Sequence, residues 1–236
     1  MCYFCSFGQS GLHDFIRSTE VPPAFSKSNL PMGAFPTTES GLRALITQHR
    51  EAPFNTSSKT VFTEDQIKSQ LFNTPQKLIW SGNSLSYSFP TAPWFSDGEA
   101  PGFSPLASTQ QGAAHHAILV WDDIISPDFT FAGSNVNATV KFENTTTSIQ
   151  YAHGYFPANS TKAGSIWLNN TVNSGPDDVV TPKMGAWGFT TYIHEAGHAL
   201  GLSHPGKYDA SQGQFTYAAA AEYLQDTQMF SVMSYF

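Results

Sequence analysis

Cysteine is nearly absent from this sequence of 236 residues, which contains only Cys2 and Cys5. Because both lie close to the N-terminus, no disulfide can form within the body of the chain, which argues against a disulfide-stapled secreted domain. Long apolar runs are absent as well, so we expect no membrane insertion. The first residues show no basic stretch followed by an apolar one, and an ordinary signal peptide is therefore not expected.

Positive charge is also scarce. Lys and Arg number 11 against 18 Asp and Glu, which gives a net charge of −7. An acidic surface repels polyphosphate, so we expect neither nucleic acid nor an anionic membrane as a partner. The aromatic fraction of 14% is high enough for a packed core. The length allows one large domain, or one domain with a small extension.

The pattern of apolar residues predicts a mixed domain behind an N-terminal extension. Residues 1–36 are rich in Ser, Gly and Pro and show no period, which indicates an extension or propeptide, and residues 37–236 form the expected domain. Helices are expected at 42–49, from 63 onward, from before residue 113 to about 125, and around the histidines near 194. Strands are expected at 85–89, 129–131, 140–142, 151–156 and 165–168. This order suggests an α/β or α+β fold.

One helix start carries a local signature. In Phe62-Thr63-Glu64-Asp65-Gln66-Ile67, Thr63 can cap the helix and Gln66 can reach back to the cap. Phe62 can pack on Ile67 as a hydrophobic staple.

The run at residues 194–204 reads His-Glu-Ala-Gly-His-Ala-Leu-Gly-Leu-Ser-His. His194 and His198 are one helical turn apart on the same face, so they can bind one ion. Gly201 lets the chain leave the helix through a left-handed residue and turn back, which brings His204 to a third ligand position. Zinc favours neutral imidazole nitrogens, and a catalytic site keeps one position open for water. The pattern therefore predicts a catalytic zinc site with three histidine ligands.

Glu195 follows the first ligand directly. Its carboxylate is placed to take a proton from the zinc-bound water rather than to bind the metal. Two plainer interpretations are a buried helix with hydrogen-bonded core histidines and a structural zinc site. Each element of the eleven-residue motif has its own physical reason, which disfavours the first. A structural site usually closes with a fourth Cys or His, and no Cys lies near the motif.

The last residues, Phe230-Ser231-Val232-Met233-Ser234-Tyr235-Phe236, suggest a second part of the site. A methionine in a tight turn beneath three histidines would give the ligands an apolar floor. The Tyr235 hydroxyl could reach the metal or a developing oxyanion. Taken alone, such a stretch is more typical of an ordinary buried strand or turn.

Together these two motifs resemble the metzincin metalloproteases. Pro205, directly after the third histidine, and the turn sequence Ser-Val-Met-Ser-Tyr narrow the resemblance to the serralysin type, which are secreted bacterial proteases. The resemblance covers about residues 38–236 and includes segments 39–50, 61–72 and 164–170.

The resemblance implies a metzincin-like fold, with a twisted mixed sheet, an active-site helix, and a cleft between a larger N-terminal and a smaller C-terminal part. It implies that His194, His198 and His204 bind zinc. Glu195 would be the general base and then the acid for the leaving amine, and Tyr235 a distant zinc ligand that swings to steady the tetrahedral intermediate. Residues 151–155 resemble the edge strand on which a peptide is laid, by backbone hydrogen bonds.

The chain also departs from that family, because it has no Gly-Gly pair and hence none of the glycine-rich calcium-binding repeats. We expect either a C-terminally truncated catalytic portion or a shorter protein, with calcium relevant only if a repeat domain exists in the full-length protein. The expected protein is a secreted monomer that cleaves proteins or peptides and could meet a proteinaceous inhibitor. The rival interpretation is a zinc-binding module without turnover, which the intact Glu195 disfavours.

Four smaller signals are weaker. A thiolate of Cys2 or Cys5 could occupy the open zinc position as a latch, although a plain tail is the simpler interpretation. His115 and His116 are expected to face solvent or lie near a cap rather than to bind metal. His153 is expected to contact peptide rather than to bind metal. The Asp177-Asp178 pair could bind a cation, but a solvated turn is the preferred interpretation.

Overall fold

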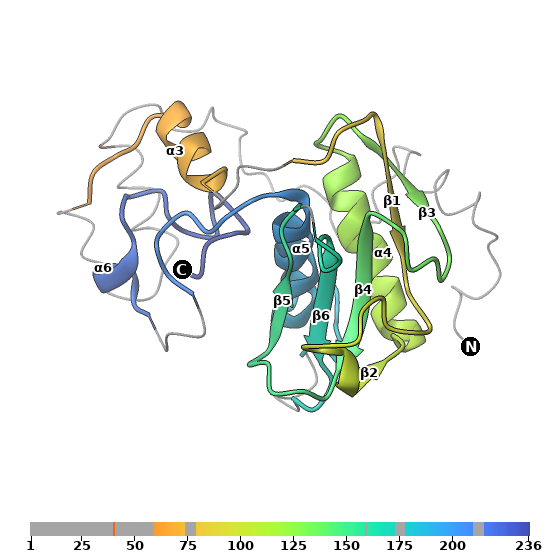
Figure 1. Ribbon diagram of the computed structural model, residues 1–236. Helices are drawn as coiled ribbons and strands as arrows, with labels where there is room; N and C mark the ends of the chain where they lie inside the picture. The colour runs from red at the N-terminus through yellow and green to blue at the C-terminus, as the bar shows by residue number, and fades with distance from the viewer. Residues whose placement is uncertain (1–39, 41–58, 74–78, 159, 173–177, 210–214) are drawn as a thin grey trace, which may run out of the picture. The chain divides into compact units, whose positions relative to one another are not determined.

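The computed structural model describes residue 40 and residues 59–73, 79–158, 160–172, 178–209 and 215–236 (Figure 1). The extension predicted at 1–36, with both cysteines, and the helix predicted at 42–49 lie outside the described residues. The boundary between extension and domain therefore stays a prediction. No helix in the described part of the chain is long and apolar enough to cross a membrane.

A six-stranded, mostly parallel sheet forms the centre of the domain, in the order β3-β1-β4-β6-β5 with β2 beside β4. The strands are β1 (Ser84–Ser88), β2 (Phe103–Ser104), β3 (Asp128–Phe131), β4 (Val140–Thr145), β5 (Ala152–Gly154) and β6 (Ser165–Asn169). β2 and β5 run antiparallel to their neighbours. The mixed sheet and its predicted strands are confirmed.

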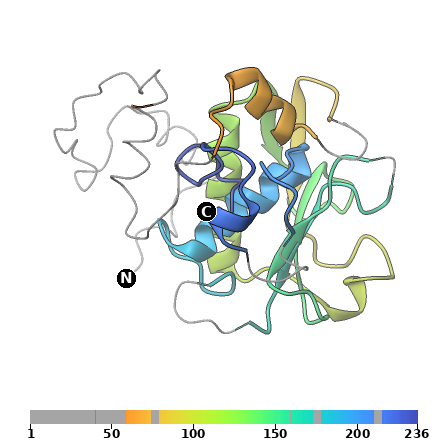
Figure 2. The same ribbon diagram turned by 90° about the vertical axis from the view of Figure 1, so that its left-hand side faces the viewer.

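Two helices, α4 (Ser108–Asp122) and α5 (Trp187–Leu200), pack on one face of this sheet (Figures 1 and 2). Between them and the sheet lies the main core, which includes Phe142, Ile166 and Tyr192. On the other face, Trp167 is covered by the rings of Phe95 and Phe103 near the short 3-10 helix η3 (Ala100–Gly102). Strands β4 and β6 are consequently buried throughout, as expected for strands covered on both faces.

The predicted extent of α4 is wrong at its C-terminal end. The helix ends at Asp122, and Ile124, which was assigned to its apolar face, is 68% exposed. The spacing of Ile124 and Ile125 continues the helical period, but the chain turns toward β3 there. The Phe129 backbone N–H donates to the Asp122 carboxylate at 2.8 Å, which fixes this turn.

Helix α3 (Glu64–Leu71) begins as predicted, because Thr63 accepts from the Gln66 backbone N–H and the Gln66 side chain accepts from that of Thr63. The segment before it pairs with the C-terminal region, where α6 (Tyr217–Ala220) lies. The Leu224 N–H donates to Thr60 at 2.8 Å, and the Phe62 ring stacks on Tyr223 with centroids 4.4 Å apart. Residues 59–71 therefore pack with the segment after Gly201, which is predicted to form the smaller part of the domain.

Candidate metal centre

The histidine motif begins inside α5 and continues past its end. Gly201 adopts a left-handed conformation, with φ 111° and ψ 9°. The Leu202 N–H donates to the Gly197 carbonyl and the Gly201 N–H to that of His198, both at 2.9 Å, which is a Schellman turn. The turn directs His204 back toward the helix, as the sequence predicts.

Each of the three histidines is oriented by a backbone carbonyl. His194 Nδ1 lies 2.8 Å from the Val232 oxygen, His198 Nδ1 2.7 Å from Leu202, and His204 Nδ1 2.8 Å from Tyr208. A carbonyl oxygen only accepts, so each Nδ1 must carry the proton. Every Nε2 is then left with a free lone pair, which is the form that binds a metal ion.

The three free nitrogens converge on one point. His204 Nε2 lies 3.1 Å from that of His194 and 3.0 Å from that of His198. Because each Nδ1 is the protonated nitrogen, these short approaches bring lone pairs together and only a cation between them would stabilise the arrangement. Ligands 2.0–2.1 Å from a tetrahedral zinc lie about 3.3 Å apart, so the spacing fits zinc. Among the described residues, this is the one group of three side chains that could hold a metal ion.

Burial keeps these imidazoles neutral. It lowers the pKa of His194 to about 4, with a smaller effect from His204, and lowers the pKa of His198 well below its ordinary value. The pKa of His204 is lowered for the same reason. A site that disfavours the imidazolium form favours a metal ion over a proton at neutral pH.

Glu195 lies beside this cluster and is only 7% exposed. Its Oε2 atom has no hydrogen-bond partner among the described residues. Burial raises the pKa of its carboxyl group to about 8, and a hydrogen bond from the Gly154 backbone acts in the opposite direction. A bound cation would also lower this pKa. The Oε2 atom therefore lies in the site with no hydrogen bond from a side chain of the described residues.

Met233 forms the floor under the helix, as predicted for a methionine in the last turn. It is fully buried in the main core. A Cβ atom at Gly197 would collide with Met233 Sδ and lie 3.0 Å from the Trp121 ring. Gly197 therefore allows the turn that carries Met233 and the Val232 carbonyl to approach α5 closely.

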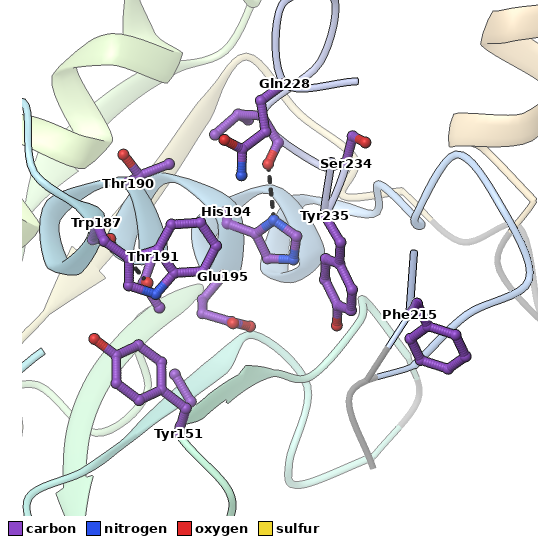
Figure 3. A pocket seen from close by; sticks show the side chains of 12 residues that line it. Tyr151, Trp187, Thr190, Thr191, His194, Glu195, Phe215, Gln228, Ser234 and Tyr235 are labelled. Atoms are coloured by element: carbon purple, nitrogen blue, oxygen red, sulfur yellow. Dashed lines mark hydrogen bonds between the residues drawn. The ribbon is translucent and has the colours of Figure 1, made fainter. Parts of the chain in front are cut away.

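Tyr235 lies on the open side of the cluster, with its ring centroid 4.5 Å from that of His204. In Figure 3 its side chain and that of Glu195 extend into the same cavity as His194. This cavity measures about 520 Å³, and a second one of about 810 Å³ is lined by His198 and His204. Glu195 and Tyr235 line both cavities.

His153 on β5 lines the second cavity, but its ring turns to a buried acid. Its Nε2 lies 3.0 Å from Glu99 Oε1, which also accepts from the Tyr155 hydroxyl at 2.8 Å. Gly154, the next residue, packs so closely on α5 that a Cβ atom there would collide with the Glu195 carbonyl. β5 is thus held tightly against α5. The predicted contact between His153 and peptide stays a prediction.

Two of the weaker predictions are wrong in detail. His115 is half-buried rather than fully solvent-facing, because its ring centroid lies within 5.5 Å of those of Tyr87, Phe89 and Phe131, and its Nδ1 is 2.9 Å from the Tyr87 hydroxyl. Asp178 is 3% exposed, and its carboxylate accepts from the Val180 and Thr181 amides, so this side chain is not solvated; Asp177 lies outside the described residues.

The sequence also gave no signal for the groups that orient the ligands. The carbonyls of Val232, Leu202 and Tyr208 are backbone atoms, so residue identity says nothing about them. Asp226, which is fully buried and accepts hydrogen bonds from Tyr208 and Ser234, stands in no recognised motif.

Sequence comparisons with known proteins also point to a metalloprotease. A sequence profile of the family described as Peptidase M66 matches residues 182–225, which contain the histidine motif. The chain is 32% identical to Serralysin G of Dickeya chrysanthemi over 79% of its own length and 41% of that protein. It is 35% identical to Metalloprotease AprA of Pseudomonas entomophila over 85% of its length and 43% of that protein.

The chain therefore spans less than half the length of these relatives. The matches extend over about four fifths of this chain, well beyond the short motif. Over this region the chain belongs to the serralysin-type family of metalloproteases.

Proposed function

We propose that this chain is a zinc-dependent endopeptidase that hydrolyses peptide bonds in proteins. One observation carries the proposal: three metal-ready Nε2 atoms converge beside a buried carboxylate with an unpartnered oxygen, at a point that opens to two cavities. A site that only stores zinc has no use for such a carboxylate.

In this proposal His194, His198 and His204 hold the zinc, which would supply Lewis acidity when bound. Glu195 takes a proton from the attacking water and later delivers it to the leaving amine. Its unpartnered Oε2 is free to do so. The Tyr235 hydroxyl stabilises the negative charge that develops on the carbonyl oxygen of the scissile bond.

The substrate would lie in a cleft between the larger and the smaller part of the domain. β5 stands at the end of the strand order, so one of its edges has no strand beside it among the described residues. An extended peptide can add to such an edge by backbone hydrogen bonds, which favours broad specificity. The two cavities would take substrate side chains on either side of the scissile bond.

Further properties rest on the relationship to serralysins and remain part of the proposal. The protein would be secreted and monomeric, and a proteinaceous inhibitor could close the same cleft. Calcium would matter only through a repeat domain of a longer protein.

A casein gel assay separates this proposal from a zinc-binding module without turnover. Cleavage should disappear with a chelator and return when zinc is added. Glu195→Ala should retain zinc and lose roughly 10²–10⁴-fold in rate, the usual contribution of a general base. Unchanged cleavage by Glu195→Ala would refute the role of Glu195. The absence of cleavage by the unaltered, zinc-loaded chain would favour the binding module.

A further inference from the structure

The smaller part of the domain contains a buried carboxylate that the proposed reaction does not use. Asp226 is fully buried, and its Oδ1 atom accepts two hydrogen bonds of 2.7 Å. One comes from the Tyr208 hydroxyl and the other from the Ser234 hydroxyl. Burying a carboxylate costs free energy unless hydrogen bonds compensate it. These two hydrogen bonds therefore stabilise the buried Asp226 side chain.

Both donors belong to segments that orient zinc ligands. The Tyr208 backbone carbonyl accepts from His204 Nδ1 at 2.8 Å. Ser234 follows Met233 directly, in the turn whose Val232 carbonyl accepts from His194 Nδ1. Asp226 therefore links the loop behind the third histidine with the turn behind the first one.

The surroundings leave little freedom for this link. Tyr208 is 3% exposed and Ser234 1% exposed. A Cβ atom at Gly206 would approach the Tyr208 ring to 2.6 Å and Asp226 Oδ2 to 3.1 Å. The Ser234 Oγ atom also accepts from the Phe236 backbone N–H at 3.2 Å. The carboxylate is thus enclosed by the two segments that it connects.

We propose that Asp226 is a positioning residue, which sets the orientation of His204 and His194 by holding the Tyr208 loop and the Met233 turn together. This inference rests on the proposed zinc site, because it concerns how that site is oriented. Groups that orient metal ligands from the second layer typically contribute 10- to 100-fold to metal affinity.

The test measures zinc affinity by competition with a chromophoric chelator, using the full chain. Asp226→Ala should weaken zinc binding by roughly 10- to 100-fold and alter the absorption spectrum of the cobalt-substituted protein. Asp226→Asn, whose side-chain oxygen can still accept from both hydroxyls, should recover most of the affinity. Asp178→Ala is the matched control, because it removes another buried, hydrogen-bonded aspartate and should change zinc affinity by no more than about twofold.

If Asp226→Ala does not fold, the double variant Tyr208→Phe, Ser234→Ala removes both donors and leaves the carboxylate. It should show the same loss of zinc affinity and the same spectral change. Wild-type affinity and spectrum in either variant, or an equal loss in Asp178→Ala, would overturn the positioning role. Zinc binding without proteolysis by the unaltered chain would refute only the proposed function, whereas no zinc binding at all would overturn both.

Discussion

The two sides of the metal centre are held by different forces. His194 and His198 lie on α5, whose inner face packs into the apolar core with residues such as Tyr192 and Ala196. His204 lies beyond the end of α5, in a loop that is linked through the Tyr208 hydroxyl to the buried Asp226 carboxylate. All three histidines are oriented by backbone carbonyls, but apolar packing holds the helix that carries the first two, whereas hydrogen bonds to Asp226 help to hold the segment behind the third.

The helix side should be sensitive to added volume where α5 packs on the Met233 turn. Gly197→Ala would place a methyl group against Met233 and Trp121, and we expect it to lower the free energy of unfolding by about 1–3 kcal/mol, as overpacking does. Chemical denaturation measures this change. Gly112→Ala in α4, where a Cβ atom meets nothing within 4 Å, should instead raise the stability by roughly 0.5–1 kcal/mol. Equal effects of the two changes would contradict the close packing of α5 on the Met233 turn.

A substitution at Gly201, in the turn between α5 and His204, should lower stability because it strains the backbone. Gly201→Ala forces a side chain into a left-handed conformation, at a cost of about 1–2 kcal/mol, and should also weaken zinc binding by displacing His204. Gly133→Ala is the control. Gly133 also has a positive φ, of 65°, but it is not part of the segment that carries the three clustered histidines. We expect it to lower stability, measured by denaturation, without changing zinc affinity. A loss of zinc affinity in Gly133→Ala would mean that general destabilisation explains the effect.

The smallest expected effect is a pH dependence of the free energy of unfolding, and it comes from His115, away from the metal centre. Burial lowers the pKa of His115 to about 4, so the unfolded chain binds a proton there near pH 6 while the folded chain does not. Stability from this group is therefore present above about pH 6.5 and is lost as pH falls toward 4. Between pH 7.5 and 5.5 the loss should be roughly 1 kcal/mol. His115→Gln should remove this loss, so that the free energy of unfolding changes by about 1 kcal/mol less between pH 7.5 and 5.5. An unchanged pH dependence would contradict the packing of this ring in the folded chain.

Features that depend on neighbouring residues could be predicted from the sequence. The spacing of His194 and His198 and the position of Gly201 are local signals, and the structure places all three histidines together as they predict. The alternation of Leu85, Tyr87 and Phe89 likewise depends only on neighbouring residues. Local periodicity and turn chemistry therefore predict the sheet, helix α5 and the convergence of the three histidines.

What the sequence could not give depends on contacts between distant segments. His115 on α4 is half-buried because Phe131, on strand β3, packs against its ring. Asp226 is placed by hydroxyl groups from two separate loops. Such partners share no spacing along the chain, and polar residues carry no periodic signal that would reveal their burial.

The most direct test of the central claim is a zinc titration of the metal-free chain, with cleavage of an internally quenched peptide and bound zinc measured in the same samples. The account predicts that cleavage rises in proportion to bound zinc and reaches its maximum at one zinc per chain. Cleavage without zinc, or a chain that holds one zinc and cleaves nothing, would contradict it.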